Sequence, residues 1–501
     1  MKKKMFKRAG VAVLSMAMLL SMGAVGAISA SAYTAGQGGL EVTTGTGVVS
    51  STNLTITAYK VATVNNSGNW AWDANLTGMN ATDMGYLTAA TPDANNIKTV
   101  ADKLAAQTLT GVPSVLLTLG TENTTVPEGY YLILAQDTSA SDTIIQPMLK
   151  QVIAGEKATV SDPKVTKINM DKIISSVSGK GNVVDGSSNN VAHVAEDDIV
   201  NYTLKTTFPI YSNSVTTLGS YPFKVTDTYD AALTVKDTPP LAVYVDTDGT
   251  AGLDTTSDTH LTLSTDYTFT NDTTNHQFVV QFLDATVLNT AYRGKDVYIT
   301  FSAQFDAPAT PNTGYEYDNT AKVSYDNTYT ATATQYKEES DDADVYSVPL
   351  KIFKTDGTNP ITAVHATFQL TDGTNTYSVT TDGTGYAKFP SLNAGTYTLS
   401  ETAAPLGYKK IDGDIGQFKI EVANNGTVTV SQKIGNAASF TPMTAEADLY
   451  FNYEVVNEAT DSLPGTGGMG TIMFTVGGAA IVLCAGFMFV IYMRKRRAEE
   501  E

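Results

Sequence analysis

The feature that most constrains this chain is an apolar run near its C-terminus, from about Thr471 to Met493. These 23 or so residues would form a helix of roughly 35 Å, long enough to cross the hydrocarbon core of a bilayer. The basic cluster Arg494–Arg497 follows directly, and such clusters mark the cytoplasmic end of a membrane helix. We therefore expect residues 462–501 to contain a stop-transfer anchor, with the preceding chain outside the cell.

The short motif Leu463-Pro464-Gly465-Thr466-Gly467 lies just before the apolar run. Pro464 keeps it out of a helix, and its two glycines keep it narrow and pliable, so the Thr466–Gly467 bond can lie in the cleft of another enzyme. Motif, apolar run and basic tail together resemble the cell-wall sorting signal of Gram-positive surface proteins, which a sortase cleaves between Thr and Gly. The alternative is a flexible linker before an ordinary single-span anchor. The motif residues are Leu463, Pro464, Gly465, Thr466 and Gly467.

The N-terminal segment has the three parts of a secretory signal peptide. Basic residues from Lys2 to Arg8 precede an apolar run that begins near Ala9, and the small-residue site Ala30-Ser31-Ala32 ends it. We expect residues 1–32 to be removed on export.

Composition limits what the exported part can be. The formal net charge of the whole chain is −19 at pH 7. This charge argues against nucleic-acid binding, which needs a basic face. The single cysteine, Cys484, lies in the apolar run, so no disulfide can stabilise the exported part. Charged residues make up only 17% of the chain, fewer than in disordered acidic sequences. We expect a folded, mainly β protein.

Strand-like alternation recurs through three blocks, and we predict tandem immunoglobulin-like antiparallel β-sandwiches. The blocks are residues 33–163, 164–345 and 346–461. In the first block, Thr91-Pro92 predicts a helix start with Thr as the cap and Pro at the first helical position. Strands are expected at 54–59 and 130–134 in the first block, and at 200–208 and 297–305 in the second.

Three polar residues of the last block fall on strand faces that should be buried: Lys354, Glu401 and Asn457. Burial lowers the pKa of a lysine and raises that of a glutamic acid, so a neutral amine can attack the Asn carbonyl while the carboxyl group relays protons. Ammonia leaves, and an intramolecular isopeptide bond remains. The alternative is a Lys–Glu salt bridge at the rim beside a surface Asn.

The segments around these residues resemble collagen-adhesin B-type domains, which form this cross-link. The resemblance implies that Lys354 and Asn457 are joined and that Glu401 promotes the reaction. The matching segments are the first-strand lysine motif at 350–356, the E-box at 397–408 and the last-strand Asn at 455–457.

The middle block contains a second candidate group of a lysine, an acid and an asparagine. Asp227 shares a face with Phe223 and Val225, and Asn319 shares a face with neighbouring apolar residues. The segments 223–228 and 318–323 resemble the acid and asparagine strands in the central domain of shaft pilins. Lys172 fits the family's first strand, but Lys167, on the opposite strand face, stays open as the alternative. A salt bridge without a covalent bond is the other alternative.

The whole chain resembles a sortase-assembled major pilin, or fimbrial shaft subunit. The resemblance implies that Lys164 of one subunit attacks the acyl-enzyme formed on Thr466 of another, giving a covalent homopolymer on the cell surface. Pro163 and Lys164 match the family's Tyr-Pro-Lys-Asn-like motif, whereas Asp162 and Val165 replace its Tyr and Asn. The alternative is that Lys164 is an ordinary solvated lysine.

The implied partners are sortase, identical subunits, peptidoglycan, and minor tip and base pilins; the membrane is a partner only before sorting. No cofactor, metal or enzymatic activity is expected beyond autocatalytic isopeptide formation. The main alternative is a wall-anchored adhesin that is never polymerised and binds a host glycan or matrix protein.

Two other readings find little support in the sequence. A secreted enzyme is disfavoured because the histidines are scattered and no nucleophile motif accompanies them. A turn containing Asp246, Asp248, Asp254 and Asp258 has oxygen ligands for calcium, but its spacing departs from the EF-hand pattern.

Overall fold

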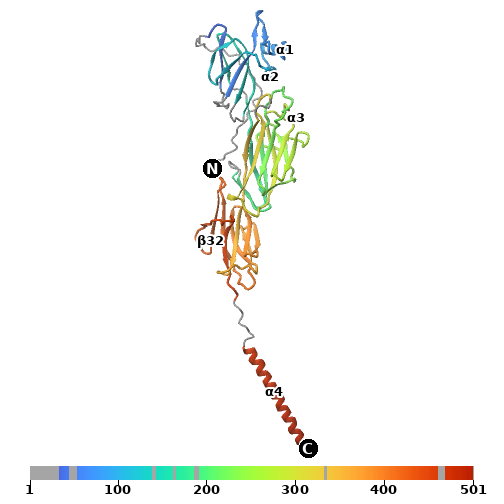
Figure 1. The fold of residues 1–501 in the computed structure, drawn as a ribbon, viewed down its shortest axis with the longest axis vertical. Helices are drawn as coiled ribbons and strands as arrows, with labels where there is room; N and C mark the ends of the chain where they lie inside the picture. Colours follow the sequence, from blue (N-terminus) through green and yellow to red (C-terminus); the bar gives the residue numbers. More distant parts are fainter. Residues whose placement is uncertain are drawn as a thin grey trace.

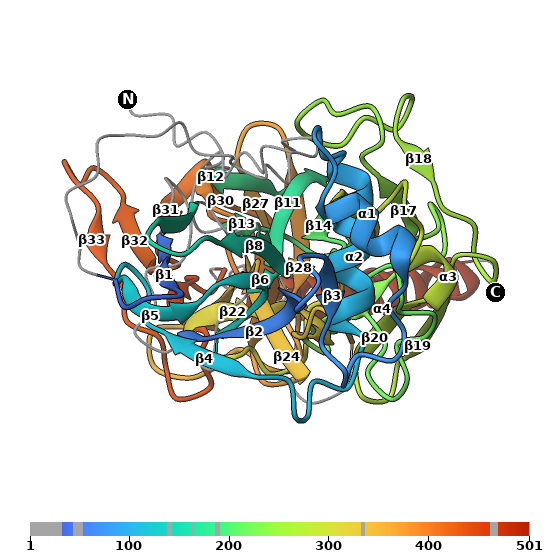
Figure 2. The same ribbon diagram turned by 90° about the horizontal axis from the view of Figure 1, so that it is seen from above.

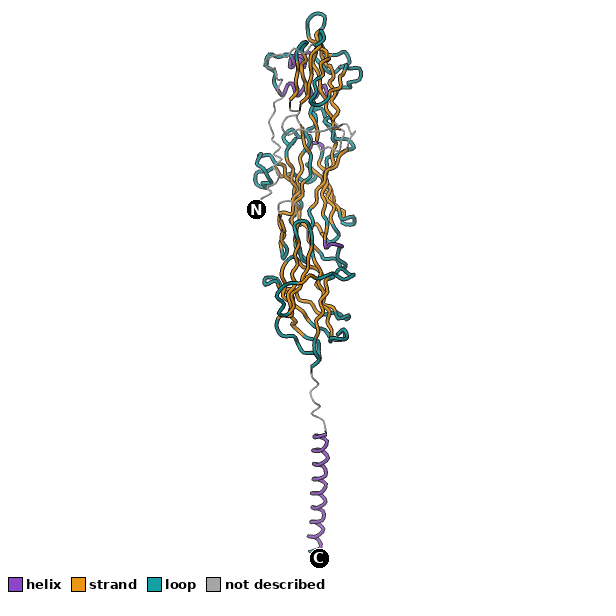
Figure 3. Tube along the Cα trace, turned by 90° about the vertical axis from the view of Figure 1, so that its left-hand side faces the viewer, coloured by secondary structure: helices purple, strands orange, loops and turns teal. Residues whose placement is uncertain are grey.

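The computed structural model describes residues 33–43, 54–137, 143–161, 165–185, 191–331, 336–460 and 469–499. Three β-rich units follow one another along the long axis (Figure 1). Strands dominate each unit, and the first also contains two helices (Figure 3). The mainly β fold class is confirmed, with multiple antiparallel sheets, few helices and one apolar C-terminal helix.

The first unit is built around β2 (Leu54–Val64), which pairs with β3, β4 and β6. A smaller sheet has the order β5-β1-β9. The expected strands at 54–59 and 130–134 lie within β2 and β6. Its other elements are β1 (Gln37–Thr43), β3 (Trp70–Trp72), α1 (Ala81–Leu87), α2 (Ala94–Ala105), β4 (Ser114–Leu117), β5 (Asn123–Pro127), β6 (Gly129–Asp137), β7 (Thr143–Ile145), β8 (Met148–Val152) and β9 (Lys157–Ser161).

Helix α2 packs its apolar face on this sheet, with Ile97, Val100 and Leu104 buried in one cluster with Leu132. The predicted cap was wrong. The helix begins at Ala94, and the Asp93 carboxylate accepts the N–H groups of Asn95 and Asn96, each at 3.0 Å. A carboxylate that accepts two free amides also complements the positive end of the helix, so Asp93 caps in place of Thr91.

The middle unit is a sandwich of two antiparallel sheets. One has the order β11-β14-β21-β17-β18 and the other β19-β20-β15-β23-β24. The expected strands at 200–208 and 297–305 correspond to β14 and β21. The elements are β10 (Val165–Lys167), β11 (Asp171–Ser178), β12 (Asn182–Asp185), β13 (Val191–His193), β14 (Ile199–Thr207), β15 (Lys224–Tyr229), β16 (Leu233–Val235), β17 (Ala242–Val245), β18 (Thr259–His260), β19 (Tyr267–Asp272), β20 (Gln277–Phe282), α3 (Asp284–Val287), β21 (Asp296–Phe305), the 3-10 turn Thr313–Tyr315, β22 (Glu316–Tyr317), β23 (Asn319–Asp326), β24 (Tyr336–Asp342) and β25 (Val345–Tyr346).

The third unit is a smaller sandwich of the sheets β29-β26-β34 and β28-β27-β30-β31-β32-β33. Strands β26 and β34 are parallel neighbours, which places the first and last strands of the unit side by side. The elements are β26 (Val348–Thr355), β27 (Thr367–Thr371), β28 (Thr376–Thr380), β29 (Tyr386–Leu392), β30 (Gly395–Ala403), β31 (Asp414–Val422), β32 (Val428–Ile434), β33 (Thr441–Pro442) and β34 (Phe451–Val456).

Both junctions between units are contact surfaces. At the first, β10 pairs with β7 of the preceding unit, and Tyr329 of the middle unit donates a hydrogen bond to Asp102 on α2. At the second, Val191, Tyr346 and Val422 form a small apolar cluster. In the view from above, which looks down the long axis, the units lie one behind another (Figure 2).

Helix α4 (Met469–Ala498) follows the third unit. By length and composition, its segment Met473–Ala498 is able to cross a membrane, with a mean hydropathy of 2.3. The expected anchor corresponds to this helix. The expected signal peptide, Lys164 and the motif Leu463–Gly467 lie outside the described residues.

Candidate functional site: two buried lysine pockets

In the middle unit, Lys172, Asp227 and Asn319 come from three strands and are fully buried. Lys172 lies on β11 of one sheet, while Asp227 and Asn319 lie on the neighbouring strands β15 and β23 of the facing sheet. In the β15–β23 register, Asp227 pairs with Ala321 and Tyr229 with Asn319, so the two polar side chains are diagonal neighbours on one face. The sandwich therefore brings the amine and the acid together between its sheets.

The Lys172 Nζ donates to Asp227 Oδ2 at 2.5 Å. Burial lowers the pKa of Lys172 and raises that of Asp227, although each carries the opposite charge to its partner. Both directions favour the neutral pair, with the proton on the carboxyl group. A neutral amine is the form that can act as a nucleophile.

The Asn319 side-chain amide makes no close hydrogen bond to Lys172 or Asp227, and the Tyr202 hydroxyl is the polar group that interacts with it. Burying a polar group without a close hydrogen bond is costly, about 1–3 kcal/mol for each group. An amide held this way beside an amine and an acid has the chemistry of a reactant more than that of a structural hydrogen-bonding group.

Sequence reasoning missed the aromatic walls and flanking acids of this pocket. The Lys172 Nζ lies 5.2 Å from the ring centroid of Tyr202 and 5.8 Å from that of Phe301. Asp341 accepts the Lys172 backbone N–H at 2.7 Å, and Asp344 accepts that of Asn319 at 3.1 Å. Strand alternation did predict inward positions for both aromatic residues, but not that they line this pocket. The acids could not be found in this way, because strand periodicity does not reveal backbone hydrogen-bond partners.

The alternative lysine lies elsewhere. Lys167 is exposed on β10, which pairs with β7, whereas Lys172 is buried on β11 of the main sandwich.

In the third unit, Lys354, Glu401 and Asn457 are also buried, with exposed fractions of 0%, 2% and 1%. Lys354 lies on β26 and Glu401 on β30 of the facing sheet. Asn457 lies one residue beyond β34, where its N–H donates to the Thr355 carbonyl at 3.0 Å. This backbone bond continues the parallel pairing of β26 and β34 and holds Asn457 near Lys354.

In this pocket the acid, Glu401, is hydrogen-bonded to the side-chain amide of Asn457. Asn457 Nδ2 donates to both oxygens of Glu401, at 2.9 and 3.0 Å, and the Ile411 N–H donates to Glu401 Oε2 at 2.8 Å. Asn457 Oδ1 has no partner among the described residues. The carboxyl group is thus positioned at the nitrogen that would depart as ammonia.

Lys354 is held by backbone oxygens, donating to the Val455 carbonyl at 2.8 Å and the Thr355 carbonyl at 3.3 Å. Burial lowers its pKa to about 8, against the raising effects of Glu401 and Glu454. A lysine with this pKa is neutral far more often at pH 7 than an exposed lysine. No ion pair joins Lys354 to Glu401 within the described residues, in contrast to the contact between Lys172 and Asp227.

Comparisons with known proteins agree with the fold. A family model for SpaA, described as a prealbumin-like fold domain, matches residues 348–435. The T6 backbone pilin of serotype M6 Streptococcus pyogenes is similar in structure, with a TM-score of 0.53 and 15% identity, covering 85% of this chain and 99% of its own. The full-length major pilin SpaD from Corynebacterium diphtheriae follows, with a TM-score of 0.47 and 16% identity, covering 87% and 99%.

At this level of identity, the T6 comparison establishes a shared fold over most of the chain. No curated protein matches the chain in sequence.

Proposed function

We propose that this chain is a structural shaft subunit of a covalently polymerised surface pilus. The observation that carries the proposal is that two successive units each bury a lysine, a carboxylic acid and an asparagine between their sheets. The exported part of this chain has no cysteine, and its fold is similar to that of a backbone pilin. Isopeptide bonds would take the place of disulfides, because they join strands that would otherwise separate under pulling force.

Within each unit, the lysine Nζ attacks the Asn side-chain carbon, forming a C–N bond. The acid polarises the amide and passes a proton to the departing nitrogen, which leaves as ammonia. Lys172 joins Asn319 with Asp227 as the acid, and Lys354 joins Asn457 with Glu401 as the acid. Burial of Lys172 and exposure of Lys167 support this choice of lysine in the middle unit.

Between subunits, a sortase cleaves after Thr466 and transfers the threonine carbonyl to Lys164 of the next subunit. Support for this step comes from the sequence motif and from the position of Lys164, between β9, which ends at Ser161, and β10, which begins at Val165. Residues at such a connection between units are accessible to another enzyme more readily than residues within a sheet. The final subunit is transferred to peptidoglycan.

Wall extracts resolved by denaturing gel electrophoresis test the proposal. The wild-type chain should give a ladder of high-mass species that survives boiling in detergent, and Lys164→Ala should collapse it. Lys167→Ala, an exposed lysine three residues along, is the matched control and should leave the ladder intact.

A ladder that persists in Lys164→Ala would remove that lysine from the linkage. A single wall-linked band of monomer size in the wild type would instead favour the unpolymerised adhesin, which needs only the sorting signal.

A further inference from the structure

The loop between β17 and β18 brings together three carboxylates from its two ends. Asp246 and Asp248 lie at its start and Asp258 at its end. One oxygen from each lies within 4.8 Å of the others. Two oxygens bound to one calcium ion at about 2.4 Å can be separated by no more than about 4.8 Å, so this spacing matches a shared ion.

Asp258 supplies the observation that distinguishes this loop from an ordinary acidic turn. Its side chain is only 7% exposed, and its Oδ1 atom has no hydrogen-bond partner among the described residues. The other oxygen, Oδ2, accepts the Asp254 N–H at 2.8 Å, which orients the carboxylate. A buried, unpaired carboxylate oxygen is costly unless a cation compensates it.

Lys295 acts electrostatically on Asp246, but it forms no ion pair with any of the three carboxylates within the described residues. The neighbouring Asp296 has Lys205 as its ion-pair partner at 2.8 Å, whereas none of the three loop carboxylates has such a partner within the described residues. Three carboxylates with an oxygen from each within 4.8 Å of the others repel one another when ionised. A divalent ion would relieve this repulsion.

Asp254 has a different role from the one its sequence position suggests. It is not one of the three carboxylates that lie close together. Its Oδ1 accepts the N–H and hydroxyl of Thr256, at 2.9 and 2.6 Å, so it closes a local turn, as Asp248 does with the N–H and hydroxyl of Thr250 at 2.7 and 2.8 Å. The turn at Asp254 returns Asp258 towards the start of the loop, which explains how three carboxylates meet without EF-hand spacing.

We propose that Asp246, Asp248 and Asp258 form a calcium site that fixes the β17–β18 loop to the edge of the middle unit. Three carboxylates are hard oxygen ligands suited to Ca²⁺, whose shell of 6–8 oxygens water would complete. The site lies apart from the lysine pocket, since β17 and β18 form the edge of the sheet whose opposite edge is β11.

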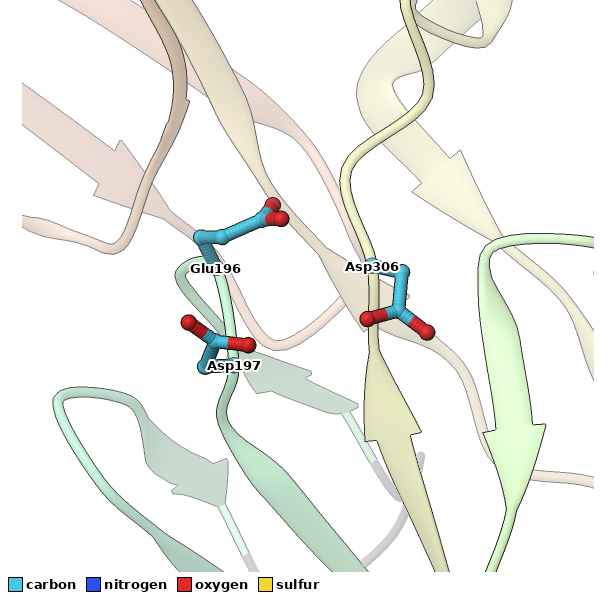
Figure 4. Close-up of side chains that lie close together, drawn as sticks. All are labelled: Glu196, Asp197 and Asp306. Carbon is cyan, nitrogen blue, oxygen red and sulfur yellow. The ribbon is translucent and has the colours of Figure 1, made fainter.

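A second acidic group in the same unit provides the control. Glu196, Asp197 and Asp306 also lie close together (Figure 4). There the Gln304 amide already donates to Asp197 at 2.9 Å and to Asp306 at 3.1 Å, and none of the three carboxylates has a buried, unpaired oxygen among the described residues.

The test is calorimetric titration of CaCl₂ into the full-length, detergent-solubilised, EDTA-treated chain. One ion per chain should bind with a dissociation constant in the range of about 10⁻⁴–10⁻³ M or tighter, as in other extracellular modules. Asp258→Asn should weaken binding at least tenfold. Asp248→Asn, which changes an exposed side chain and should not disturb folding, should do the same.

The triple variant Glu196→Gln/Asp197→Asn/Asp306→Asn should bind calcium like the wild type. Absence of saturable binding up to about 10 mM, well above the range of such sites, would overturn the proposal. Binding that is unchanged in Asp248→Asn, or lost in the triple variant, would also overturn it.

Discussion

At the scale of single residues, the two pockets hold the same three kinds of side chain but differ in which of them the carboxyl group contacts. In the middle unit the lysine contacts the acid, and in the third unit the acid contacts the asparagine. In each pocket the carboxyl group contacts one of the two groups between which the proposed reaction would transfer a proton. The acid is therefore the residue whose removal should stop the reaction with the least change in shape.

Glu401→Gln keeps the size of the side chain but removes the proton relay. Each isopeptide bond lowers the intact mass by one ammonia, about 17 Da by the stoichiometry of the reaction. The wild-type chain should be lighter than its sequence by two such losses, and Glu401→Gln by one. Glu421→Gln, at an exposed position of β31, is the control and should retain both. Two losses in Glu401→Gln would show that this acid is dispensable.

The reaction in the third unit should depend on pH through Lys354. Its pKa is lowered to about 8, so the neutral, nucleophilic fraction rises about tenfold per unit below pH 8 and levels off above it. Chain synthesised in a cell-free system at pH 6 and shifted to a higher pH should lose ammonia from this pocket faster as the pH approaches 8. Peptide mapping by mass spectrometry follows the 354–457 cross-link separately. A rate that is flat or falling from pH 6 to pH 8 would contradict attack by the neutral amine.

At the scale of elements, helix α2 forms the contact between the first two units. Asp102 is 2% exposed and accepts hydrogen bonds from the Tyr329 hydroxyl, from Lys98 and, at 3.2 Å, from the Asn213 N–H. Arg293 supports the same loop through the Asn213 side chain at 2.6 Å. This network ties the helix to the middle unit.

Tyr329→Phe removes the hydrogen bond that its hydroxyl donates to the buried Asp102, which is worth about 1.5–3 kcal/mol. It also removes the one that the hydroxyl accepts from Lys98 at 2.5 Å. Because the helix is held at this point, amide hydrogen exchange in α2 should accelerate about 10- to 100-fold. Tyr221→Phe, another tyrosine of the middle unit, which stacks on Tyr336, should leave exchange in α2 unchanged. Equal exchange in the wild type and Tyr329→Phe would mean that packing alone fixes the junction.

Much of the element pattern could be predicted from the sequence. Alternation identified β2, β14 and β21, each of which has one more deeply buried face. Strand β6 is buried on both faces from Tyr130 to Ile133, and its continuous run of aromatic and aliphatic residues identified it. The cap of α2 was assigned to the wrong residue because Thr91, Pro92 and Asp93 all carry start signals, and only the fold decides between them. Helix α1 was missed because its seven residues are too few to show a period, although Asn80 and Asp83 form a capping box.

The site was predictable to the extent that it depends on strand faces. Inward positions of Lys354, Glu401, Asp227 and Asn319 follow from period-two alternation alone. The sequence did not favour a metal site around Asp258, because the spacing of the aspartates was compared only with that of the EF-hand loop. Side chains that meet through a folded turn have no fixed spacing, so only the structure could bring them together.

At the scale of the whole molecule, the three units and their junctions form one elongated body (Figure 1). In the proposed fibre, force enters at Lys164 and leaves at Thr466. The path between these residues runs through the middle and third units, which are the two that hold the lysine pockets. The first unit lies outside that path, and the sequence left open whether it has a cross-link of its own.

The most direct test of the central claim is peptide mapping of the purified high-mass species by mass spectrometry. The account predicts a branched peptide in which the Thr466 carbonyl is joined to the Lys164 side chain, together with the internal cross-links 172–319 and 354–457. Finding Thr466 joined only to peptidoglycan, with Lys164 unmodified in every species, would contradict it.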